Sequence, residues 1–585
     1  MFPFYEIKFK RNLIDFCYRP IFETQIVILN KTSTHQLYWD RKIKMSKESI
    51  VSKDSPLIVG ILFLTSLWWL GYTGPAFSDD ISYLHFGYNL FAGIPNPEPD
   101  NFSLRWGAFW LPGLLLYIFN FSDHLGSLAS LIYTCGSLSI LYFLLPERFM
   151  RITLVVFFTT NVYLIHFINQ VFPDSALLLW VTLIPAALYR RGYKPMVAAL
   201  LVALGFWMGM NTKETIIYLL PLPLVLLVFD FYHKRSLVFY IHLAAFTILF
   251  GLIYFGYFYL FYDDPFYKFI SINEAHYIGE FSYYDKSVGT IFSRVSYRPL
   301  MIFISRTYWI WIILAVPGIL RALKNPKELH FVFAVSSLCL LLGFLFMSTS
   351  FSFYNPIHLN PRHLIILIPS LSVNIALEIK RWTSHYFWKR FVLLWICFAA
   401  VVSFALVSWQ YGLFYSGIAA CFLFKRPKLQ VAGIASILVF TTIYAEWTVK
   451  EEKQYEHMVS MLKETIAESG ENTPIITHAL LCQAAPLIFH SPIAELPLLD
   501  ITALEEKIEA DDLQEEFYVF TYSYLSEITP QDNSLLSQLQ KFGIKYNYSW
   551  LKKHEDPWVS IYHLKKTITL PTFPDNTSTF GAEMQ

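Results

Sequence analysis

The stretch GYTGPAFSDDISYLHFGYNLFAG, from Gly71 to Gly93, places two adjacent aspartates just after an apolar segment that is long enough to cross a membrane. A spanning helix needs about 20 mostly apolar residues, with about 17 as the lower limit, and residues 56–73 meet this requirement. Asp79 and Asp80 are therefore expected where the chain leaves the bilayer. The spacing of the apolar residues that follow predicts a helix that lies in the membrane interface and ends near Gly93.

The whole chain has the composition of a membrane protein. Of its 585 residues, 55% are hydrophobic and 15% are charged, whereas soluble domains carry about 25% charged residues. We predict a polytopic α-helical membrane protein with about 13 spans between residues 56 and 447. The predicted spans are 56–73, 125–145, 152–168, 175–189, 195–210, 215–230, 237–262, 307–323, 329–348, 363–379, 391–409, 411–424 and 429–447.

The loops between these spans alternate in character. One set, which includes PERFMR, YHKRS and KRPK, is rich in Lys and Arg, whereas the other set is longer, more aromatic and more acidic. A Lys/Arg excess marks the cytoplasmic side. We therefore expect a cytoplasmic N-terminal segment, 1–55, and outer loops at 74–123 and 263–306. Met45 is an alternative start of the protein, because MSKESIVSKDSP has the character of a short cytoplasmic leader.

An odd number of spans places the remainder of the chain on the outer side. Residues 448–566 are predicted to form a small extracytoplasmic α/β domain, because helical and strand patterns alternate along them. EHMVSMLKETIAES and SLLSQLQKFG have helical spacing, whereas TPIITH, EEFYVFTYS and WVSIYHLK are typical of strands. Residues 567–585 are predicted to be a flexible tail.

Charge and cysteine content exclude several classes of function. The net charge is +1 and there is no Lys/Arg-rich recognition stretch, so no nucleic acid partner is expected. The six cysteines include no pair at CxxC spacing, which indicates neither a zinc site nor a disulfide framework.

Acidic residues at the outer ends of spans are the first candidates for chemistry. Asp79 and Asp80 also fit a structural role, because Ser78 can cap a helix and acidic residues suit a helix N-terminus. Adjacent helical residues diverge by about 100°, so one aspartate would face a site and the other would support it. Asp174, in NQVFPDSALLLW, lies at the mouth of another span, where it either caps a helix or contributes to the same site.

Three cations also lie at outer span ends, against the positive-inside bias. They are Arg105 in NFSLRWGAFWLPG, Lys213 in GMNTKETIIYLLP and Arg362 in NPIHLNPRHLIILIPSL. Arg105 can instead lie along the interface beside Trp106, and Glu214 can simply neutralise Lys213. Together the three favour an anionic ligand on the outer face, with a phosphate as the obvious candidate.

The outer loop 263–306 contains SINEAHYIGEFSYYD. Glu274 and His276 in this stretch are residue types that can bind a metal or a substrate. A Glu-x-His pair, however, more often makes ordinary loop contacts. The aromatic residues around them suit contact with sugar faces or with the membrane interface.

In their order along the chain, these motifs resemble the polyprenyl-phosphate-sugar glycosyltransferases of the C-type (GT-C) superfold. That group includes the protein O-mannosyltransferases and the lipid A aminoarabinose transferases, and the resemblance covers about residues 56–380. The family's Asp-Glu pair has Asp in the second position here. The matching positions are Asp79, Asp80 and Tyr83, Arg105 with Pro112, Asp174, Thr212 with Lys213, the loop around Glu274 and His276, and Arg362 with His363, where His takes the place of an aromatic residue.

The resemblance implies a function for each group. Asp79 would be the general base of an inverting sugar transfer from a polyprenyl phosphate, while Asp80 and Asp174 would position the acceptor or the sugar. The phosphate would contact Arg105, Lys213 or Arg362, and the sugar or acceptor would contact the loop residues Tyr83, Glu274 and His276. The acceptor would be a hydroxyl of a lipid, a glycan or a protein, at the outer face of a bacterial inner membrane. No metal would be obligatory, although a divalent cation serves some related enzymes.

Three other functions fit parts of the sequence. A transporter or flippase would need ionisable residues in mid-span and two repeated halves, and neither is evident. A ligase or polymerase of related fold would use a pyrophosphate-linked donor, and DDISY favours the monophosphate class only weakly. A non-catalytic scaffold would retain the fold without needing the aspartates and cations.

Overall fold

The computed structural model describes residues 54–96, 101–274, 283–326, 328–348, 350, 353–470, 473–492, 496–501, 515–528, 539 and 546–566. Most of the predicted N-terminal segment 1–55, the predicted tail 567–585 and nearly all of the predicted helix 534–543 lie outside the described residues.

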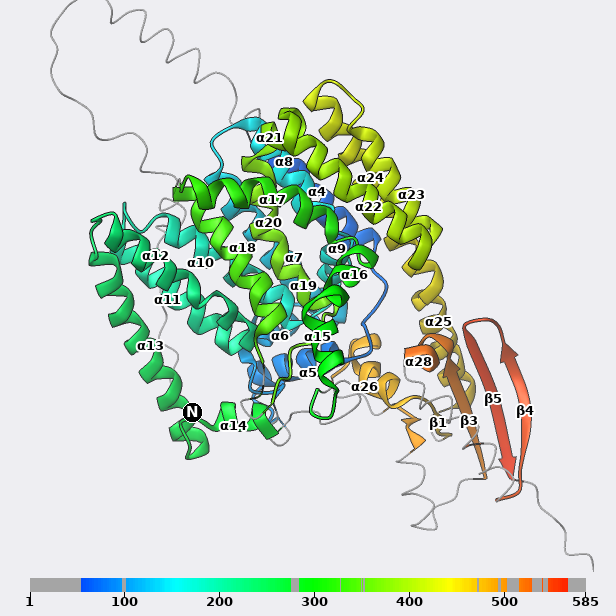
Figure 1. Cartoon of the computed structure of the whole chain (residues 1–585). Coiled ribbons are helices and arrows are strands. Elements are labelled where there is room, and N and C mark those ends of the chain that lie inside the picture. The colour runs from blue at the N-terminus through cyan, green and yellow to red at the C-terminus, as the bar shows by residue number, and fades with distance from the viewer. Residues whose placement is uncertain are drawn as a thin grey trace, which may run out of the picture. The chain divides into compact units, whose positions relative to one another are not determined.

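Each of the predicted spanning segments contains a helix, which confirms a polytopic α-helical membrane protein (Figure 1). The helices of the bundle are α4 (Ser55–Leu70), α7 (Asp123–Leu144), α8 (Arg148–Thr159), α9 (Val162–Ile168), α10 (Pro173–Tyr189), α11 (Pro195–Thr212), η1 (Glu214–Leu219), α12 (Pro221–Tyr232), α13 (Val238–Tyr262), α17 (Trp309–Lys324), α18 (Glu328–Phe346), α19 (Pro361–Leu364), η2 (Ile365–Leu367), α20 (Ile368–Leu377), α21 (Ile379–Ser384), α22 (Tyr386–Leu406), α23 (Trp409–Cys421) and α24 (Pro427–Lys453).

The number of spans depends on how bent helices are counted. Among the described residues, seven helices are long and apolar enough to cross a membrane, or up to nine if each of two bent pairs is one span. The segment predicted as one span at 152–168 is such a pair, because α8 and α9 meet at 67°. Asn161 starts α9 at this bend, and its side chain accepts a hydrogen bond from the Leu164 amide at 3.0 Å. The total of 13 spans stays a prediction.

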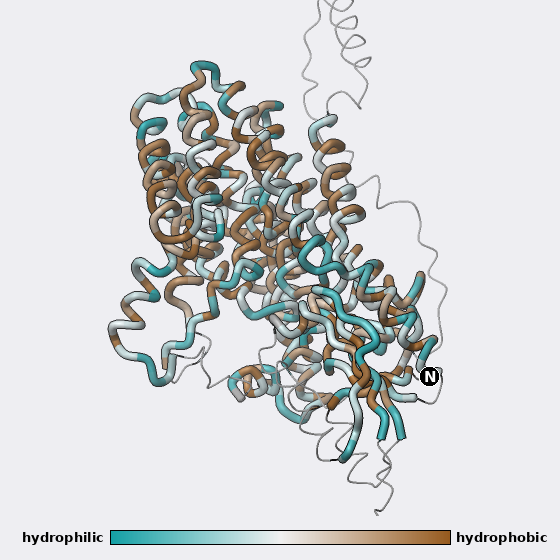
Figure 2. The backbone as a smooth tube through the Cα atoms, turned by 90° about the vertical axis from the view of Figure 1, so that its right-hand side faces the viewer, coloured by the Kyte–Doolittle hydropathy of each residue, from teal (hydrophilic) through white to brown (hydrophobic). Residues whose placement is uncertain are grey.

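Burial separates central from peripheral helices. Every residue of α20 is buried, whereas α13 buries only Phe239, Tyr254 and Phe258 along its 25 residues. The apolar side chains that α13 exposes suit contact with lipid. Figure 2 shows the apolar helices in brown through the bundle, with polar segments gathered at its ends and in the C-terminal strands.

The two predicted outer loops are themselves largely helical. The first carries α5 (Asp79–Ala92) and α6 (Trp106–Ile118), and the second carries α14 (Tyr267–Glu274), α15 (Val288–Val295) and α16 (Tyr297–Ser305). Helix α5 ends as predicted at Gly93, whose φ of 71° is the left-handed conformation. Helices α5 and α6 approach closely where glycines meet, because a Cβ on Gly113 would lie 2.1 Å from the carbonyl oxygen of Gly87.

The C-terminal part forms a small α/β domain around a five-stranded sheet of order β2-β1-β3-β5-β4. Strands β2, β1 and β3 are parallel, while β5 runs antiparallel to both β3 and β4. The elements are α25 (Tyr455–Ser469), β1 (Ile475–Ile476), α26 (Ala479–Ile488), β2 (Leu498–Leu499), β3 (Glu516–Tyr522), α28 (Ser523–Ile528), β4 (Tyr548–Glu555) and β5 (Val559–Lys566). The predicted strands within TPIITH, EEFYVFTYS and WVSIYHLK correspond to β1, β3 and β5, whereas β2, β4, α26 and α28 were not predicted.

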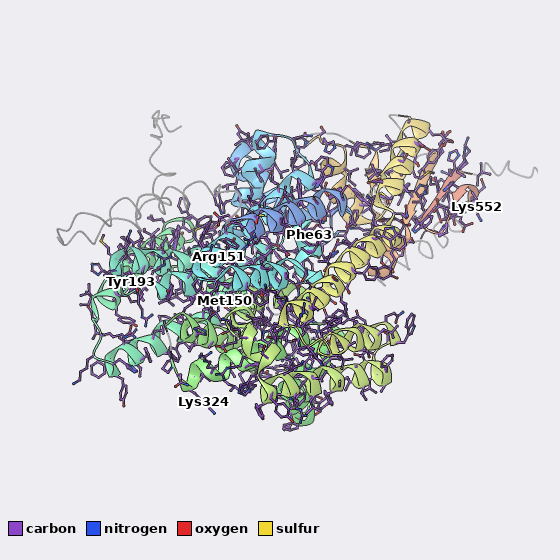
Figure 3. The ribbon with its side chains drawn as sticks, turned by 90° about the horizontal axis from the view of Figure 1, so that it is seen from above. Phe63, Met150, Arg151, Tyr193, Lys324 and Lys552 are labelled. Carbon is purple, nitrogen blue, oxygen red and sulfur yellow. The ribbon has the colours of Figure 1, made fainter. Side chains whose placement is uncertain are left out.

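This domain contacts the bundle at the end where α5 lies. The ring of His85 on α5 hydrogen-bonds to the carbonyl oxygen of Gln483 at 2.9 Å, and that of His490 to the carbonyl oxygen of Phe121 at 3.2 Å. Viewed from above, Lys552 of β4 lies at the margin of the molecule, beyond the helices that carry Phe63 and Arg151 (Figure 3).

Candidate active site

Two of the three predicted aspartates, Asp79 and Asp174, converge at one end of the bundle with two of the three predicted cations, Lys213 and Arg362. Arg362 Nη2 lies 3.5 Å from Asp79 Oδ2, and Arg362 Nε lies 3.4 Å from Asp174 Oδ2. Lys213 and His363 complete this group of five residues, which we call the aspartate cluster. Its members come from the start of α5, the start of α10, the residue after α11 and from α19, so that four distant segments build one site.

Asp174 and Lys213 form the buried centre of this cluster. Lys213 Nζ lies 2.8 Å from both carboxylate oxygens of Asp174 and 2.8 Å from His363 Nδ1. The side chains of Asp174 and Lys213 are only 1% and 7% exposed. Helix α10 begins at Pro173 with Phe172 in the cap position, so Asp174 in the first turn pairs with a cation rather than capping the helix. Two charges are stable at such depth only when they are paired.

Arg362 is held less tightly than Lys213. Asn360 caps α19 by accepting a hydrogen bond from the Arg362 amide at 3.0 Å, and the guanidinium lies 4.3 Å from the centre of the Phe172 ring. Its distances to the two carboxylates exceed the usual N–H···O range of 2.7–3.2 Å. Its buried Nε makes no hydrogen bond to any described residue. Arg362 therefore retains donor capacity that an anion can use.

A second group, the arginine cluster, consists of Tyr83, Arg105, Glu214 and Lys268. Arg105 donates to Glu214 at 2.9 and 3.4 Å and to the Tyr83 hydroxyl at 3.2 Å. Lys268 Nζ lies 3.8 Å from Glu214 and donates to the Met210 carbonyl at 2.6 Å. The expectation that Glu214 neutralises Lys213 is thus wrong, because Glu214 pairs with Arg105 and Lys268 instead. One carboxylate between two cations leaves this cluster with a positive charge.

Lys268 was not among the predicted site residues, although its side chain is only 1% exposed. It lies in the predicted outer loop 263–306, where a cation opposes the positive-inside bias. Lys268 therefore carries the same sequence signal as Arg105 and Lys213.

Helix α5 serves both clusters from one face. Asp79 and Tyr83 are four residues apart and lie one above the other on a helix, with Asp79 in the aspartate cluster and Tyr83 in the arginine cluster. The side chain of Asp79 is 31% exposed, so solvent and substrate can reach it. Tyr83 is buried, and burial raises the pKa of its hydroxyl to about 12.

Asp80 belongs to neither the aspartate cluster nor the arginine cluster. It is 1% exposed, and its two oxygens accept hydrogen bonds from the amides of Ala76 at 2.6 Å and Ser78 at 2.9 Å. The Ser78 side chain makes no cap hydrogen bond, so the expected serine cap is absent and the Asp80 carboxylate orders the chain ahead of the helix instead. Burial raises the pKa of Asp80 to about 6, against these two hydrogen bonds and the charge of Lys453.

The predicted loop pair is only partly described. Glu274 is the last residue of α14, and His276 lies outside the described residues. Their role toward metal or substrate stays a prediction.

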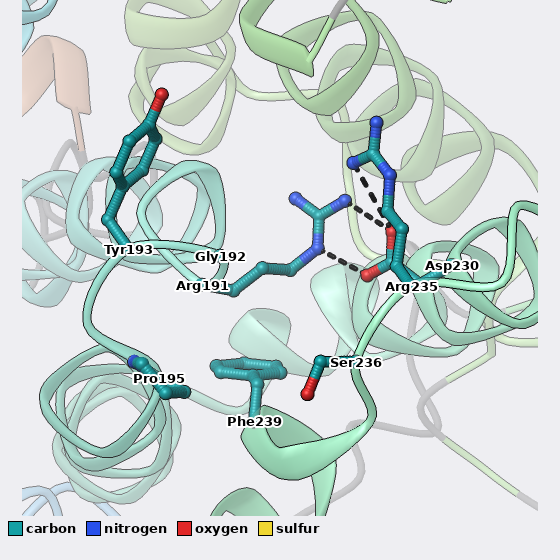
Figure 4. A pocket seen from close by; sticks show the side chains of 8 residues that line it. All are labelled: Arg191, Gly192, Tyr193, Pro195, Asp230, Arg235, Ser236 and Phe239. Atoms are coloured by element: carbon teal, nitrogen blue, oxygen red, sulfur yellow. Dashed lines mark hydrogen bonds and ion pairs between the residues drawn. The ribbon is translucent and has the colours of Figure 1, made fainter.

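A cavity of about 370 Å³ lies at the opposite ends of the helices that build the site (Figure 4). It is formed where α10 connects to α11 and α12 connects to α13, and the Arg191–Asp230 ion pair, at 2.6 Å, lines it. Arg235 lies 3.5 Å from the same carboxylate. Because the aspartate cluster occupies the other ends of α10 and α11, this cavity is a separate feature.

The structure of this chain is similar to solved structures of another protein, whereas its sequence matches no known family. No protein-family model matches the sequence, and no curated protein is significantly similar to it. The crystal structure of ArnT from Cupriavidus metallidurans in the apo state is similar over 86% of this chain and 97% of that chain, with a TM-score of 0.56 and 12% identity. The structure of the same protein bound to undecaprenyl phosphate is similar over 87% and 98%, with a TM-score of 0.55 and 12% identity. The chain thus shares the fold of ArnT, in agreement with the fold that the motif resemblance predicted.

Proposed function

We propose that this chain is an inverting glycosyltransferase that moves a sugar from a polyprenyl phosphate to a hydroxyl acceptor. The observation that carries the proposal is the convergence of Asp79, Asp174, Lys213 and Arg362 at one end of a GT-C bundle. An accessible carboxylate beside an incompletely bonded arginine provides a base and an anion contact within a few ångströms of each other.

Arg362 is the first candidate for contact with the donor phosphate. A guanidinium forms bidentate hydrogen bonds with phosphate, and Arg362 contacts its present carboxylate partners only at 3.4 and 3.5 Å. Lys213 is already paired closely with Asp174, which suits a supporting role better than direct binding. The surplus positive charge of Arg105 and Lys268 would attract the same anion. That ArnT has been crystallised with undecaprenyl phosphate supports a polyprenyl phosphate as the anion.

Asp79 would act as the general base. The acceptor oxygen attacks the anomeric carbon, its proton passes to the Asp79 carboxylate, and the bond between that carbon and the phosphate oxygen breaks. The polyprenyl phosphate leaves with the bonding electron pair, next to Arg362. Attack from the face opposite the leaving group inverts the anomeric centre. General-base assistance of this kind is worth about 10²–10⁴-fold in rate.

The reaction would take place at the outer face of a bacterial inner membrane, with the N-terminus in the cytoplasm. The site, the helical loops and the C-terminal domain all lie at the end of the bundle opposite the basic connections 145–148, 190–194 and 233–237. The acceptor is a lipid, a glycan or a protein, and the α/β domain beside α5 is placed to contact it. No metal is required by this chemistry, because a carboxylate base and cationic side chains suffice.

The test uses the purified protein in lipid, a panel of radiolabelled polyprenyl-phosphate sugars and a native membrane extract as acceptor. Wild type is compared with Asp79→Asn, which is nearly isosteric and removes the base. Asp285→Asn is the matched control, because this carboxylate is 72% exposed and lies in the other outer loop. We expect transfer by wild type and control, and loss of transfer with retained donor binding in Asp79→Asn.

The other outcomes separate the alternatives. Equal transfer by Asp79→Asn would move the base to another carboxylate of the cluster. Transfer only from pyrophosphate-linked donors would identify a ligase or polymerase of the same fold. Movement of the donor lipid across the vesicle membrane, without transfer of its sugar, would favour a flippase.

A further inference from the structure

Two histidines and one aspartate meet in the C-terminal domain, away from both clusters of the proposed active site. His457 Nε2 lies 2.6 Å from Asp556 Oδ2, and His554 Nε2 lies 2.8 Å from the same oxygen. The three candidate ligand atoms all lie within 4.8 Å of one another. Two imidazole nitrogens therefore converge on one carboxylate oxygen from segments about one hundred residues apart in the chain.

The position of Asp556 is fixed by the backbone. Its other oxygen, Oδ1, accepts hydrogen bonds from the amides of Trp558 at 2.8 Å and Val559 at 2.7 Å in the turn between β4 and β5. These bonds leave Oδ2 directed at the two histidines. Partners of this kind, which hold a ligand in its orientation, are a usual feature of protein metal sites.

A β-bulge in β4 brings His554 to the same face of the sheet as Ile561. The β4–β5 register shifts between Lys552, which pairs with Tyr562, and His554, which pairs with Ile561. Residues that pair across strands share a face, and one inserted residue reverses the alternation. Without Lys553 as the extra residue, His554 would lie on the face of Tyr562. With it, His554 shares the face of Ile561, which packs in the same core as Tyr455 and Met458 of α25, the helix of His457.

The ligand set indicates the kind of ion. Imidazole nitrogen combined with a single carboxylate suits Zn²⁺ and neighbouring transition metals, whereas Mg²⁺ and Ca²⁺ prefer oxygen ligands throughout. The side chains of His457, His554 and Asp556 are 34%, 35% and 19% exposed, so that an ion and a water molecule can reach them. We infer that His457, His554 and Asp556 form a binding site for a transition-metal ion of the Zn²⁺ class, which ties helix α25 to the β4–β5 hairpin.

The role expected of the ion is structural. The ion would join α25 to the β4–β5 hairpin at the edge of the sheet. Helix α25 directly follows the last membrane helix, α24. A bound metal stabilises the folded state, because the unfolded chain does not present the three ligands together.

The test uses the full-length protein in detergent, purified through a tag without histidine, stripped with a chelator and then titrated with Zn²⁺. Bound metal per chain is measured by mass spectrometry after desalting, and thermal unfolding is followed with and without Zn²⁺. We expect one Zn²⁺ per chain and a higher unfolding temperature with the metal. His457→Gln and His554→Gln should each lose the stoichiometric ion and the temperature shift.

His563→Gln is the matched control. His563 lies in the same sheet, on β5, and pairs with Glu516 at 3.1 Å outside the cluster. It should retain both the ion and the shift. Asp556→Asn adds a variant that keeps an oxygen for the two backbone amides, so that loss of metal without unfolding can be observed. Wild-type protein that holds no Zn²⁺ after desalting, or equal binding by all variants, would overturn the inference and leave a hydrogen-bonded network.

Discussion

Lys213 and Glu214 are consecutive in the chain, yet their side chains pair with different partners in two different clusters. Lys213 Nζ lies 2.8 Å from both oxygens of Asp174, whereas Glu214 Oε2 lies 2.9 Å from Arg105. The divergence arises where α11 ends and the 3₁₀ helix η1 begins, because Lys213 has an extended conformation with φ −163° and ψ 138°. This single residue of extended backbone directs neighbouring charges to opposite sides and makes the two clusters distinct.

Replacing Arg362 with lysine tests its proposed contact with phosphate. Lysine keeps the charge but loses the planar fork of donors. A hydrogen bond to a charged group contributes about 1.5–3 kcal/mol, so we expect KM for the donor to rise about 10- to 100-fold with a smaller change in kcat. The kinetics of transfer at varied donor concentration give both values. Arg298→Lys, at an exposed position on α16, should behave as wild type, and an unchanged KM in Arg362→Lys would reject the contact.

The Asp174–Lys213 pair predicts a characteristic pattern of stability. Removing one member of a buried ion pair costs about 3–5 kcal/mol when the other charge is left without a partner. In Lys213→Met, Asp174 would keep only the longer contacts of Arg362 and His363, both at 3.4 Å, so we expect a cost near the lower end of this range. Lys213→Met should therefore unfold at a clearly lower temperature than wild type. The double variant Asp174→Asn/Lys213→Met removes both charges and should recover much of the lost stability without recovering transfer. If Lys213→Met is as stable as wild type, the two side chains are not paired as described.

Tyr83 is expected to act through Arg105. Its buried hydroxyl accepts a hydrogen bond from Arg105 Nη1 at 3.2 Å, so Tyr83→Phe should remove one restraint on that guanidinium. We expect a rise in donor KM of about 3- to 10-fold, the effect of about 1 kcal/mol from one hydrogen bond. Tyr88→Phe on the same helix, outside the cluster, is the control. A change in kcat alone would instead indicate that Tyr83 contacts the reacting groups.

The raised pKa of Asp80 predicts that the stability of the folded protein depends on pH. Burial raises its pKa to about 6 in the folded protein, despite hydrogen bonds from Ser78 and Ala76, whereas an unfolded aspartate has a pKa of about 3.9. Between pH 4 and pH 6 the folded state keeps a proton that the unfolded state releases, so the contribution of Asp80 to stability falls as the pH rises.

Thermal unfolding of wild type and Asp80→Asn across this range isolates the contribution, because asparagine does not titrate. The wild-type unfolding temperature, relative to that of the variant, should decline from pH 4 to pH 6 and then level off. A difference that stays constant or rises with pH would contradict the raised pKa.

Much of the architecture follows from local patterns in the sequence. Apolar runs such as residues 237–262 and 329–348 predict helices α13 and α18, because the bilayer requires about 20 apolar residues with internal hydrogen bonds. Asp79, Asp174 and Arg362 are also recognisable as charges at helix ends, because they lie where the apolar runs begin or end. The turn at Gly93 and the strand β5 are likewise recognisable from their own residues.

Only the tertiary structure decided which of these charges meet. Lys213 pairs with Asp174 and not with its neighbour Glu214, and Lys268 joins Arg105 from a loop more than one hundred and fifty residues away. Such pairings depend on how the helices pack side by side, and the periodicity of each separate helix does not specify that packing. The sequence by itself determined the membrane bundle and the types of charged residue at the ends of its helices. The packing of that bundle determined which carboxylate remains accessible and which cation retains donors for an anion.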